Sequence, residues 1–452
     1  MVTTPSTLAG RIALLLSLGL PLVGSHLAQF SLHITDTVML GWYSVEALAA
    51  AALGASAFFV LFIMGAGFSG AVMPLVAAAA ATGDEVGARR LTRMGFWLSA
   101  VYAALVLPVT LGAEQLFLAL GQSPALAEAG GSYLRIAGFG ILPALVVAVL
   151  KSTLAALGRM QVILWTTIAA AFANALLNWV LIFGHFGAPE LGLRGAAIAS
   201  VAVQIVSLAL VVVYFERDPA LSSLSLFRRL WRPDVEAMAR VFRLGWPIGL
   251  TQLAESGLFS ASAFMMGWVG TRELAAHGIA VEITAATFMV HLGLSSAATI
   301  VTARADGQGD VRGLRGTAAA AALLSGGFAI VTMSVFVLTP EPLIRLFLDP
   351  ADPEAASIVV IGAGLLAVAA AFQLADAAQV MALGLLRGLQ DTRVPMLIAG
   401  LSYWAVGVPA SYLLGFSLGL GARGIWYGLV LGLALAGGLL ILRFLVTLAR
   451  RG

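Results

Sequence analysis

The sequence predicts an all-α integral membrane protein in which twelve transmembrane helices form two pseudo-symmetric six-helix bundles. Composition is the first observation behind this fold class. Of the 452 residues, 60% are apolar and 10% are charged, and the mean hydropathy is +0.99. A soluble domain carries charge on about a quarter of its residues. The other two observations are an internal repeat and a regular alternation of charge between successive loops.

The internal repeat appears when the chain is aligned with itself at an offset of 226 residues, because Leu18–Arg89 then matches Leu244–Arg315 at 22 of 72 positions. Chance gives roughly one match in ten for a composition so rich in a few residue types. Some matched pairs are of types that composition does not favour: Pro21/Pro247, Trp42/Trp268 and Gly83-Asp84/Gly309-Asp310. A later match of 191–195 with 420–424 indicates that the second copy retraces nearly the whole of the first.

Apolar stretches of about 20 residues, enough to cross the hydrocarbon core, define the elements in order. The first stretch has no small-residue cleavage pattern and continues to Asp36, so we expect a span rather than a signal peptide. The first copy supplies spans at 12–38, 46–81, 94–112, 131–150, 161–183 and 195–215; the second supplies 241–268, 274–303, 316–338, 356–385, 396–416 and 424–447. We therefore predict bundles at 1–215 and 241–452, joined by a cytoplasmic linker at 216–240.

The loops alternate in charge, and this alternation orients the chain. Of the 25 Lys and Arg residues, 20 fall on one side: Arg11, Arg89, Arg90, Arg93, Lys151, Arg159, Arg217, Arg228, Arg229, Arg232, Arg240, Arg243, Arg304, Arg312, Arg315, Arg387, Arg393, Arg443, Arg450 and Arg451. Basic loops remain in the cytoplasm, so we expect both termini there. Six spans per copy give both copies the same orientation, as in parallel repeats related by an axis along the membrane normal.

Four carboxylates lie inside predicted spans: Asp36, Glu255, Glu282 and Asp376. A charged group at the bilayer centre costs about 2.5–3.5 kcal/mol even on the most lenient scale, so such residues usually face a cavity and mark an ion or substrate path. The alternative is a protonated, hydrogen-bonded acid that serves only helix packing. Four acids favour the ion or substrate path.

Polar neighbours accompany these acids at helical spacing. His26, Gln29, His33 and Asp36 share one face of the first span, and Asn174 and Asn178 lie one turn apart in the fifth. In the second copy the neighbours are Gln252, Phe259 and Ser262 around Glu255, and Phe372, Gln373 and Gln379 around Asp376. Imidazoles suit proton transfer, amides suit cation ligation, and rings suit cation–π attraction. Helix bridging and ordinary packing are the alternatives for all of these side chains.

Other classes of function find no support in the sequence. The chain has a single lysine and no G-x-x-x-x-G-K-[ST] motif, so it cannot drive transport with ATP through a P-loop. No His/Asp/Glu cluster has the spacing of a closed metal site, and no serine nucleophile motif is present. We therefore expect no enzymatic activity, no metal beyond Na⁺ at Glu255, Asp376 or Asp36, and no cofactor other than a coupling cation, H⁺ or Na⁺.

The chain resembles the multidrug and toxic compound extrusion (MATE) transporters, and within them the bacterial NorM-like branch. The resemblance covers essentially the whole chain. It rests on the duplicated twelve-span plan and on four motifs: Pro21…Gln29…Asp36-Thr-Val-Met39, Pro247…Gln252-Leu-Ala-Glu255, Gln373-Leu-Ala-Asp376 and Leu386-Arg-Gly-Leu-Gln-Asp-Thr-Arg-Val-Pro395.

The resemblance implies a V-shaped pair of bundles that exports cationic or amphipathic small molecules in exchange for Na⁺ or H⁺. By position, Glu255 and Asp376 would be coupling acids of the C-terminal bundle, and Asp36 would form the polar site of the N-terminal one with Asn174 and Asn178. The secondary candidates are Gln29, His33, Gln252, Phe259, Glu282, Phe372 and Gln373. Two positions depart from the family: Phe372 replaces a frequent tyrosine and so removes an oxygen ligand, and Glu282 stands where an amide is expected.

The sequence thus predicts a secondary active multidrug efflux antiporter working by alternating access. We expect a monomer in the lipid bilayer of the bacterial inner membrane, with no nucleic-acid partner. The main alternative is a flippase for lipid-linked precursors or lipids, but a cavity for a pyrophosphate-bearing lipid should be lined with arginines, and the spans hold acids instead. A channel or receptor on the same scaffold is a third reading, which substrate accumulation against a gradient would exclude.

Overall fold

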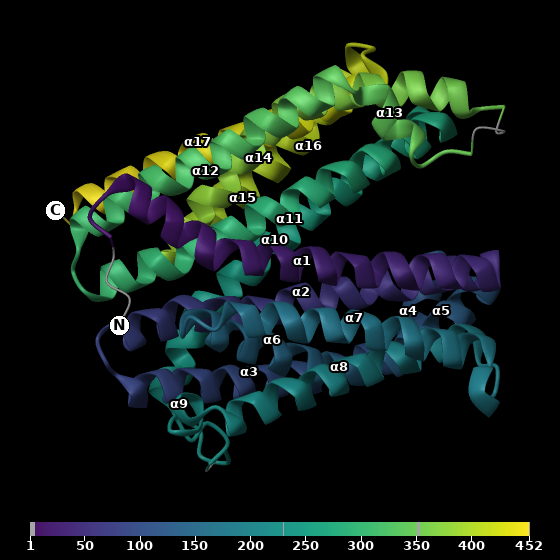
Figure 1. The fold of residues 1–452 in the computed structure, drawn as a ribbon. Helices are drawn as coiled ribbons and strands as arrows, with labels where there is room; N and C mark the ends of the chain where they lie inside the picture. Colours follow the sequence, from purple (N-terminus) through teal and green to yellow (C-terminus); the bar gives the residue numbers. More distant parts are fainter. Residues whose placement is uncertain (1–4, 229, 350–352, 452) are drawn as a thin grey trace. The chain divides into compact units, whose positions relative to one another are not determined.

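The computed structural model describes residues 5–228, 230–349 and 353–451, and these residues form helices joined by short connections, without a β-strand (Figure 1). The first copy of the repeat contains α1 (Leu8–Tyr43), α2 (Val45–Ala81), α3 (Glu85–Leu111), α4 (Ala113–Ala119), α5 (Pro124–Ala137), α6 (Ile141–Ala156), α7 (Met160–Phe183) and α8 (Gly192–Arg217). The short α9 (Pro219–Ser222) follows. The second copy contains α10 (Val235–Val269), α11 (Thr271–Gly307), α12 (Val311–Leu338), α13 (Pro340–Arg345), α14 (Ala355–Gly388), α15 (Arg393–Leu401), α16 (Val408–Tyr412) and α17 (Gly421–Ala449).

Eleven helical segments in the described part of the chain are long and apolar enough to cross a membrane. They correspond to eleven of the twelve predicted spans. The twelfth prediction, 241–268, coincides with α10, which is a 35-residue helix but is less apolar than the others. The polar residues Thr251, Gln252, Glu255 and Ser256 account for this difference, since they interrupt its apolar sequence.

Two spans are not uniform α-helices. Gly138–Gly140 forms a 3₁₀ turn between α5 and α6, so the predicted span 131–150 is a broken helix over 124–156. In the span over 393–417, π-helical segments at Ser402–Gly407 and Leu413–Ser417 flank α16. Pro409 lacks an amide hydrogen and cannot bond to the carbonyl one turn before it, which favours a wider turn ahead of it.

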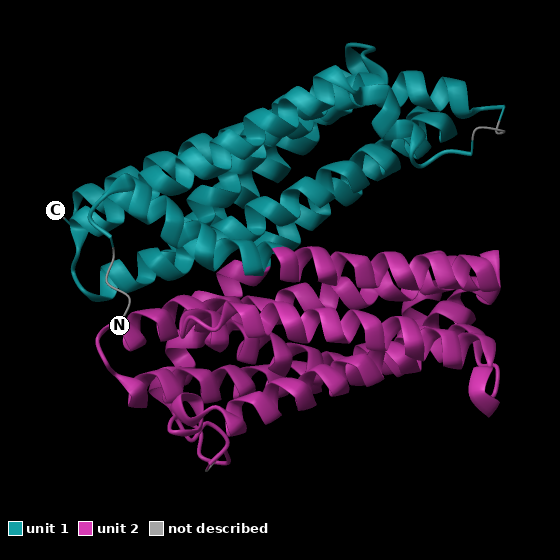
Figure 2. Ribbon diagram, in the orientation of Figure 1, with its two compact units in different colours: residues 1–23, 250–452 teal, residues 24–249 magenta. Residues whose placement is uncertain are grey.

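The described chain divides into two compact units, coloured separately in Figure 2. Unit 1 comprises residues 1–23 and 250–452, and unit 2 comprises residues 24–249. Each unit therefore takes most of one repeat and the amino-terminal part of the other repeat's first helix, because α1 and α10 both continue from one unit into the other. The predicted division into 1–215, 216–240 and 241–452 remains a prediction.

Close backbone packing holds these exchanged helix ends in place. In unit 2, a Cβ atom on Gly67 of α2 would lie 2.5 Å from the Gly245 oxygen and the Gly249 nitrogen of α10. In unit 1, a Cβ atom on Gly293 of α11 would lie 2.5 Å from a methyl group of Val23 in α1. Gly67 and Gly293 correspond under the 226-residue offset, so the repeat preserves the crossing in both units.

Each unit has its own helical core. In unit 1, α14 packs against α11, α12 and α17, and its residues Leu365, Leu366 and Ala369 are fully buried. In unit 2, α2 packs against α3, α5 and α6, while α7 packs against α8. These two cores position the intramembrane acids described below.

The segment between α8 and α10 is anchored to α3 within unit 2. Arg93 donates hydrogen bonds to the backbone oxygens of Ser225 (2.6 Å) and Leu226 (2.8 Å), and Trp97 donates to that of Leu230 (2.8 Å). Leu226 itself is buried. The described residues of the predicted linker therefore form a strap held against α3.

An ion pair closes the end of this strap, where Arg90 of α3 binds Asp234 immediately before α10. The hydrogen bond from the Arg90 guanidinium holds the pKa of the Asp234 carboxyl below its ordinary value. Glu236, 80% exposed, lies 3.4 Å from the same guanidinium. Asp234 is therefore the principal acidic partner of Arg90.

Candidate functional site: two intramembrane acid clusters

The acid of unit 2 is held by two amides from another helix. The Nδ2 groups of Asn174 and Asn178, both on α7, donate to Oδ1 of Asp36 on α1 at 2.9 and 2.5 Å. Their one-turn spacing places both amides on the face of α7 that meets α1. Both asparagines are buried, with 2% and 0% of their surface exposed, so the three residues predicted from sequence are brought together.

The same amides leave acceptor atoms without partners. The Oδ1 atoms of Asn174 and Asn178 are buried and accept no hydrogen bond from any described residue. A carboxylate beside two unpaired carbonyl oxygens is a set of hard oxygen ligands, which a monovalent cation can bind. Tyr133 of α5, which the sequence analysis missed, lies within electrostatic range of Asp36 and bonds to Ser200. Only tertiary packing could reveal it, because no motif links it to Asp36.

The other polar residues predicted on this face of α1 make fewer contacts than Asp36. His33 is exposed but lies within electrostatic range of Asp36, whereas Gln29 is exposed and has no hydrogen bond among the described residues. The part-buried His26 lies instead within electrostatic range of Lys151. Lys151 was expected in a loop but lies inside α6, where its ammonium group donates to Oγ1 of Thr167 at 2.8 Å.

The acids of unit 1 come from α10 and α14. Gln379 donates through Nε2 to Oε1 of Glu255 at 3.3 Å, and Glu255 lies within electrostatic range of Asp376. Asp376 is 2% exposed and receives no hydrogen bond from the described residues. Of these two neighbouring carboxylates, only Glu255 receives a hydrogen bond, and that bond is long. This shortage of donors favours the binding of a positive charge.

Neighbouring amides again present unpaired oxygens. The Oε1 atoms of Gln379 and Gln252 are buried without a hydrogen-bond partner among the described residues. Gln373, in contrast, is 1% exposed and accepts a hydrogen bond from Thr332 at 3.4 Å. Of the predicted amides, Gln252 therefore retains a free acceptor, while Gln373 is used for packing between α12 and α14.

The predicted phenylalanines belong to an aromatic row beside the acids. Phe259 and Phe372 meet edge to face with centroids 6.0 Å apart, and Phe372 meets Trp426 at 5.8 Å. The Trp426 indole donates to Nδ1 of His277 at 3.1 Å, so that this nitrogen is the acceptor. Phe372 is 2% exposed, and the row packs it tightly.

Glu282 does not join either cluster in the structure. Its side chain lies on an exposed part of α11 and has no hydrogen bond or ion pair among the described residues. Arg387, which was expected in a loop, lies inside α14 within electrostatic range of Glu255. The sequence did not predict that Arg387 lies near Glu255. The residue is close to the end of a span, where basic side chains usually reach the membrane surface.

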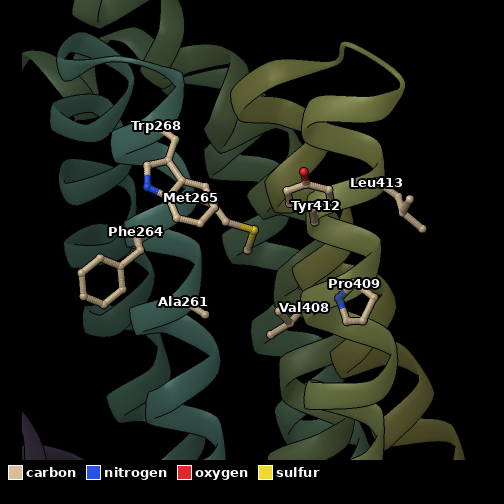
Figure 3. Close-up of a pocket in the computed structure, with 8 residues that line it drawn as sticks. All are labelled: Ala261, Phe264, Met265, Trp268, Val408, Pro409, Tyr412 and Leu413. Carbon is tan, nitrogen blue, oxygen red and sulfur yellow. The ribbon is translucent and has the colours of Figure 1, made fainter.

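An apolar hollow of about 630 Å³ lies in unit 1 between α10 and the segment around α16 (Figure 3). Its lining is Ala261, Phe264, Met265, Trp268, Val408, Pro409, Tyr412 and Leu413. Figure 3 shows Met265 and Tyr412 pointing toward each other across it. No acid lines the hollow, so it offers apolar and aromatic contact to a ligand and no charge.

The described residues contain no group of three or more His, Cys, Asp or Glu side chains that could hold a metal ion. The two clusters instead combine carboxylates with neutral oxygens. Such sets can take up a proton or a monovalent cation and can pair with an organic ammonium group.

The sequence matches a family model and known proteins over most of its length. The family model described as MatE matches residues 21–180 and 247–413. A protein of Agrobacterium fabrum named probable multidrug resistance protein NorM is 44% identical over 435 residues, covering 96% of this chain and 94% of that protein. A protein of Rhizobium meliloti with the same name is also 44% identical over 435 residues, covering 96% and 93%.

Solved structures share the fold. A MATE protein in complex with MaL6 superposes with a TM-score of 0.89 at 20% identity, covering 98% of this chain and 97% of that one. The outward-facing conformation of a multidrug resistance MATE family transporter of the MOP superfamily gives 0.87 at 20% identity, covering 98% and 96%.

Proposed function

This chain belongs to the MATE family of multidrug efflux transporters, and on that premise we propose that it is a secondary active antiporter that exports cationic or amphipathic compounds in exchange for H⁺ or Na⁺. It is a multi-pass membrane protein. We place it in the bacterial inner membrane as a monomer with both termini in the cytoplasm.

The observation that carries the proposal is the pair of acids in unit 1, of which Asp376 is buried and Glu255 is part-buried. Glu255 and Asp376 lie together with a single hydrogen bond from Gln379, so the site favours occupation by a cation. A gradient can drive export only if ion and substrate bind with opposing preference, directly or through conformation. Protonation or Na⁺ binding at these acids would cancel the negative charge that holds a cationic substrate.

The Asp36 cluster would be a second polar site of the same cycle. Its carboxylate is already satisfied by two amide donors, whereas Asp376 receives none. The acid with fewer hydrogen bonds gains more from a bound cation, and we therefore assign the main coupling role to Glu255 and Asp376. The apolar hollow between α10 and α16 would accept the hydrophobic part of an amphipathic substrate.

The test is efflux of ethidium from proteoliposomes under an imposed pH gradient and, separately, an imposed Na⁺ gradient. Parent protein should transport the dye under one of the two gradients. Glu255→Gln and Asp376→Asn should each abolish gradient-driven transport while remaining folded. Glu341→Gln, which changes a 60% exposed acid of α13, is the matched control and should transport as the parent does. Failure of both gradients to drive dye movement in folded parent protein would contradict the antiporter proposal.

A further inference from the structure

The acid pair of unit 1 has one further polar neighbour for which packing gives no role. Tyr403 is completely buried, and its hydroxyl has no hydrogen-bond partner among the described residues. Leaving a buried hydroxyl unpaired destabilises the folded protein. Phenylalanine would pack there without this cost, so the hydroxyl oxygen is available to a ligand.

Tyr403 lies in a segment that packs against the helix of Glu255. It lies in the π-helical segment Ser402–Gly407, where the wider turn changes the direction of side chains relative to a regular helix. The next residue, Trp404, donates from its indole to the backbone oxygen of Ala254 at 3.2 Å, which fixes this segment against α10 next to Glu255. The Tyr403 hydroxyl lies within electrostatic range of Glu255, Asp376 and Arg387.

The charge of the cluster determines the charge of the ligand that it can hold. Glu255 and Asp376 contribute two negative charges when ionised, and Arg387, within electrostatic range of Glu255, offsets one of them. One net negative charge remains, which a single monovalent cation neutralises. Further ligands must then be neutral oxygens, and the unpaired Oε1 atoms of Gln252 and Gln379 are two of these. The Tyr403 hydroxyl is the third.

We propose that Tyr403 is a direct ligand of the cation bound by Glu255 and Asp376, and that its hydroxyl oxygen is a neutral ligand of that site. The neutral phenol adds an oxygen ligand without adding charge. It therefore strengthens cation binding, and one monovalent cation still neutralises the cluster. When the coupling ion is H⁺, the same hydroxyl hydrogen-bonds to the protonated pair. This inference rests on the antiporter function proposed above.

The experiment compares Tyr403→Phe with the parent protein in proteoliposomes. The matched control is Tyr427→Phe, which removes a hydroxyl from an exposed tyrosine of α17 with no hydrogen bond among the described residues. Three quantities are measured: the concentration of driving ion that gives half-maximal efflux, for Na⁺ at fixed pH and for H⁺ without Na⁺; substrate affinity in the absence of the driving ion; and the midpoint of thermal unfolding.

Tyr403→Phe should raise the half-maximal concentration of the driving ion roughly tenfold, which corresponds to ~1.4 kcal/mol. Substrate affinity without the ion should remain unchanged. The unfolding midpoint of the ion-free protein should stay the same or rise, because the change removes an unpaired buried hydroxyl. Tyr427→Phe should alter none of the three.

An unchanged ion requirement in both arms for Tyr403→Phe would overturn the inference. If the unfolding midpoint also fell, the role of Tyr403 would be in packing. If folded parent protein responds to neither ion, the proposed antiporter function itself is wrong. Tyr403 then has no coupling ion to bind.

Discussion

At the scale of single residues, the Asp36 cluster shows how much a one-turn spacing reveals. The one-turn spacing predicted that Asn174 and Asn178 share a face of the fifth span, and the resemblance to the MATE transporters implied that they lie near Asp36. The structure brings all three together. Tyr133 and Tyr403 could not be predicted, since spacing along one helix says which residues share a face and nothing about which other helix meets that face.

The Asp36 cluster makes a prediction about stability. Asn178→Ala removes one of the two hydrogen bonds to the Asp36 carboxylate and should lower the free energy of unfolding by about 1–3 kcal/mol. Gln29→Ala, on the same helix as Asp36 but without a hydrogen bond, should change it by no more than about 0.5 kcal/mol. Thermal unfolding of both variants in one detergent compares them, and equal midpoints would contradict a stabilising role for Asn178.

At the scale of secondary-structure elements, the sequence analysis located the spans because length and hydropathy decide them. It could not foresee the 3₁₀ turn at Gly138–Gly140 or the π-helical segments beside α16, because such turns depend on backbone contacts with neighbouring helices. The linker was also predicted from its position alone. Its attachment to α3 depends on the pairing of Arg93 and Trp97 with backbone oxygens, which no sequence spacing encodes.

The strap over α3 makes a prediction about proteolysis. Asp234→Asn removes the anionic partner of Arg90 and should increase tryptic cleavage after Arg228 and Arg232 in inside-out vesicles several-fold. Glu236→Gln, whose side chain is 80% exposed, is the control and should have little effect. Cleavage of both variants at the parent's rate would mean that the ion pair does not anchor the strap.

The pH dependence of the same ion pair follows from the lowered pKa of Asp234. A carboxyl whose folded pKa is below its unfolded value stabilises the fold above the unfolded pKa, about 4, and loses that contribution as the pH falls through the folded value. We therefore expect hydrogen exchange in the strap to be independent of this pair between pH 5 and 8. If hydrogen exchange in the strap instead rises within that pH range in both the parent and Asp234→Asn, a group other than Asp234 controls the opening of the strap.

The helix crossings provide a matched test at the same scale. Gly67→Ala and Gly293→Ala would each place a methyl group 2.5 Å from neighbouring atoms, and we expect a loss of about 1–3 kcal/mol or more in stability. Gly326→Ala on α12, which meets no atom within 4 Å, should be neutral or stabilising. Size-exclusion profiles after heating report the ranking, and a Gly67→Ala protein as stable as Gly326→Ala would show that the crossing can relax.

At the scale of the whole molecule, the internal repeat predicted two related halves. It could not predict that each compact unit takes residues from both, because the exchange depends on where α1 and α10 pack along their length. A chain cut between Trp231 and Arg232 should therefore yield fragments that are stable only together. Each fragment alone would lack a helical segment that its unit requires, and accumulation of either one as a folded species by itself would contradict this expectation.

The exchange of helix ends also has a consequence for biosynthesis. The ribosome makes the first turns of α1 before any other helix, yet their packing partner is α11, in the second copy. The opening segment of the chain must therefore remain inserted without its final neighbours until more than half of the protein has followed it. Unit 2 is complete once residue 249 has been synthesised, whereas unit 1 closes only with the last helix, so maturation of the two units is staggered in time.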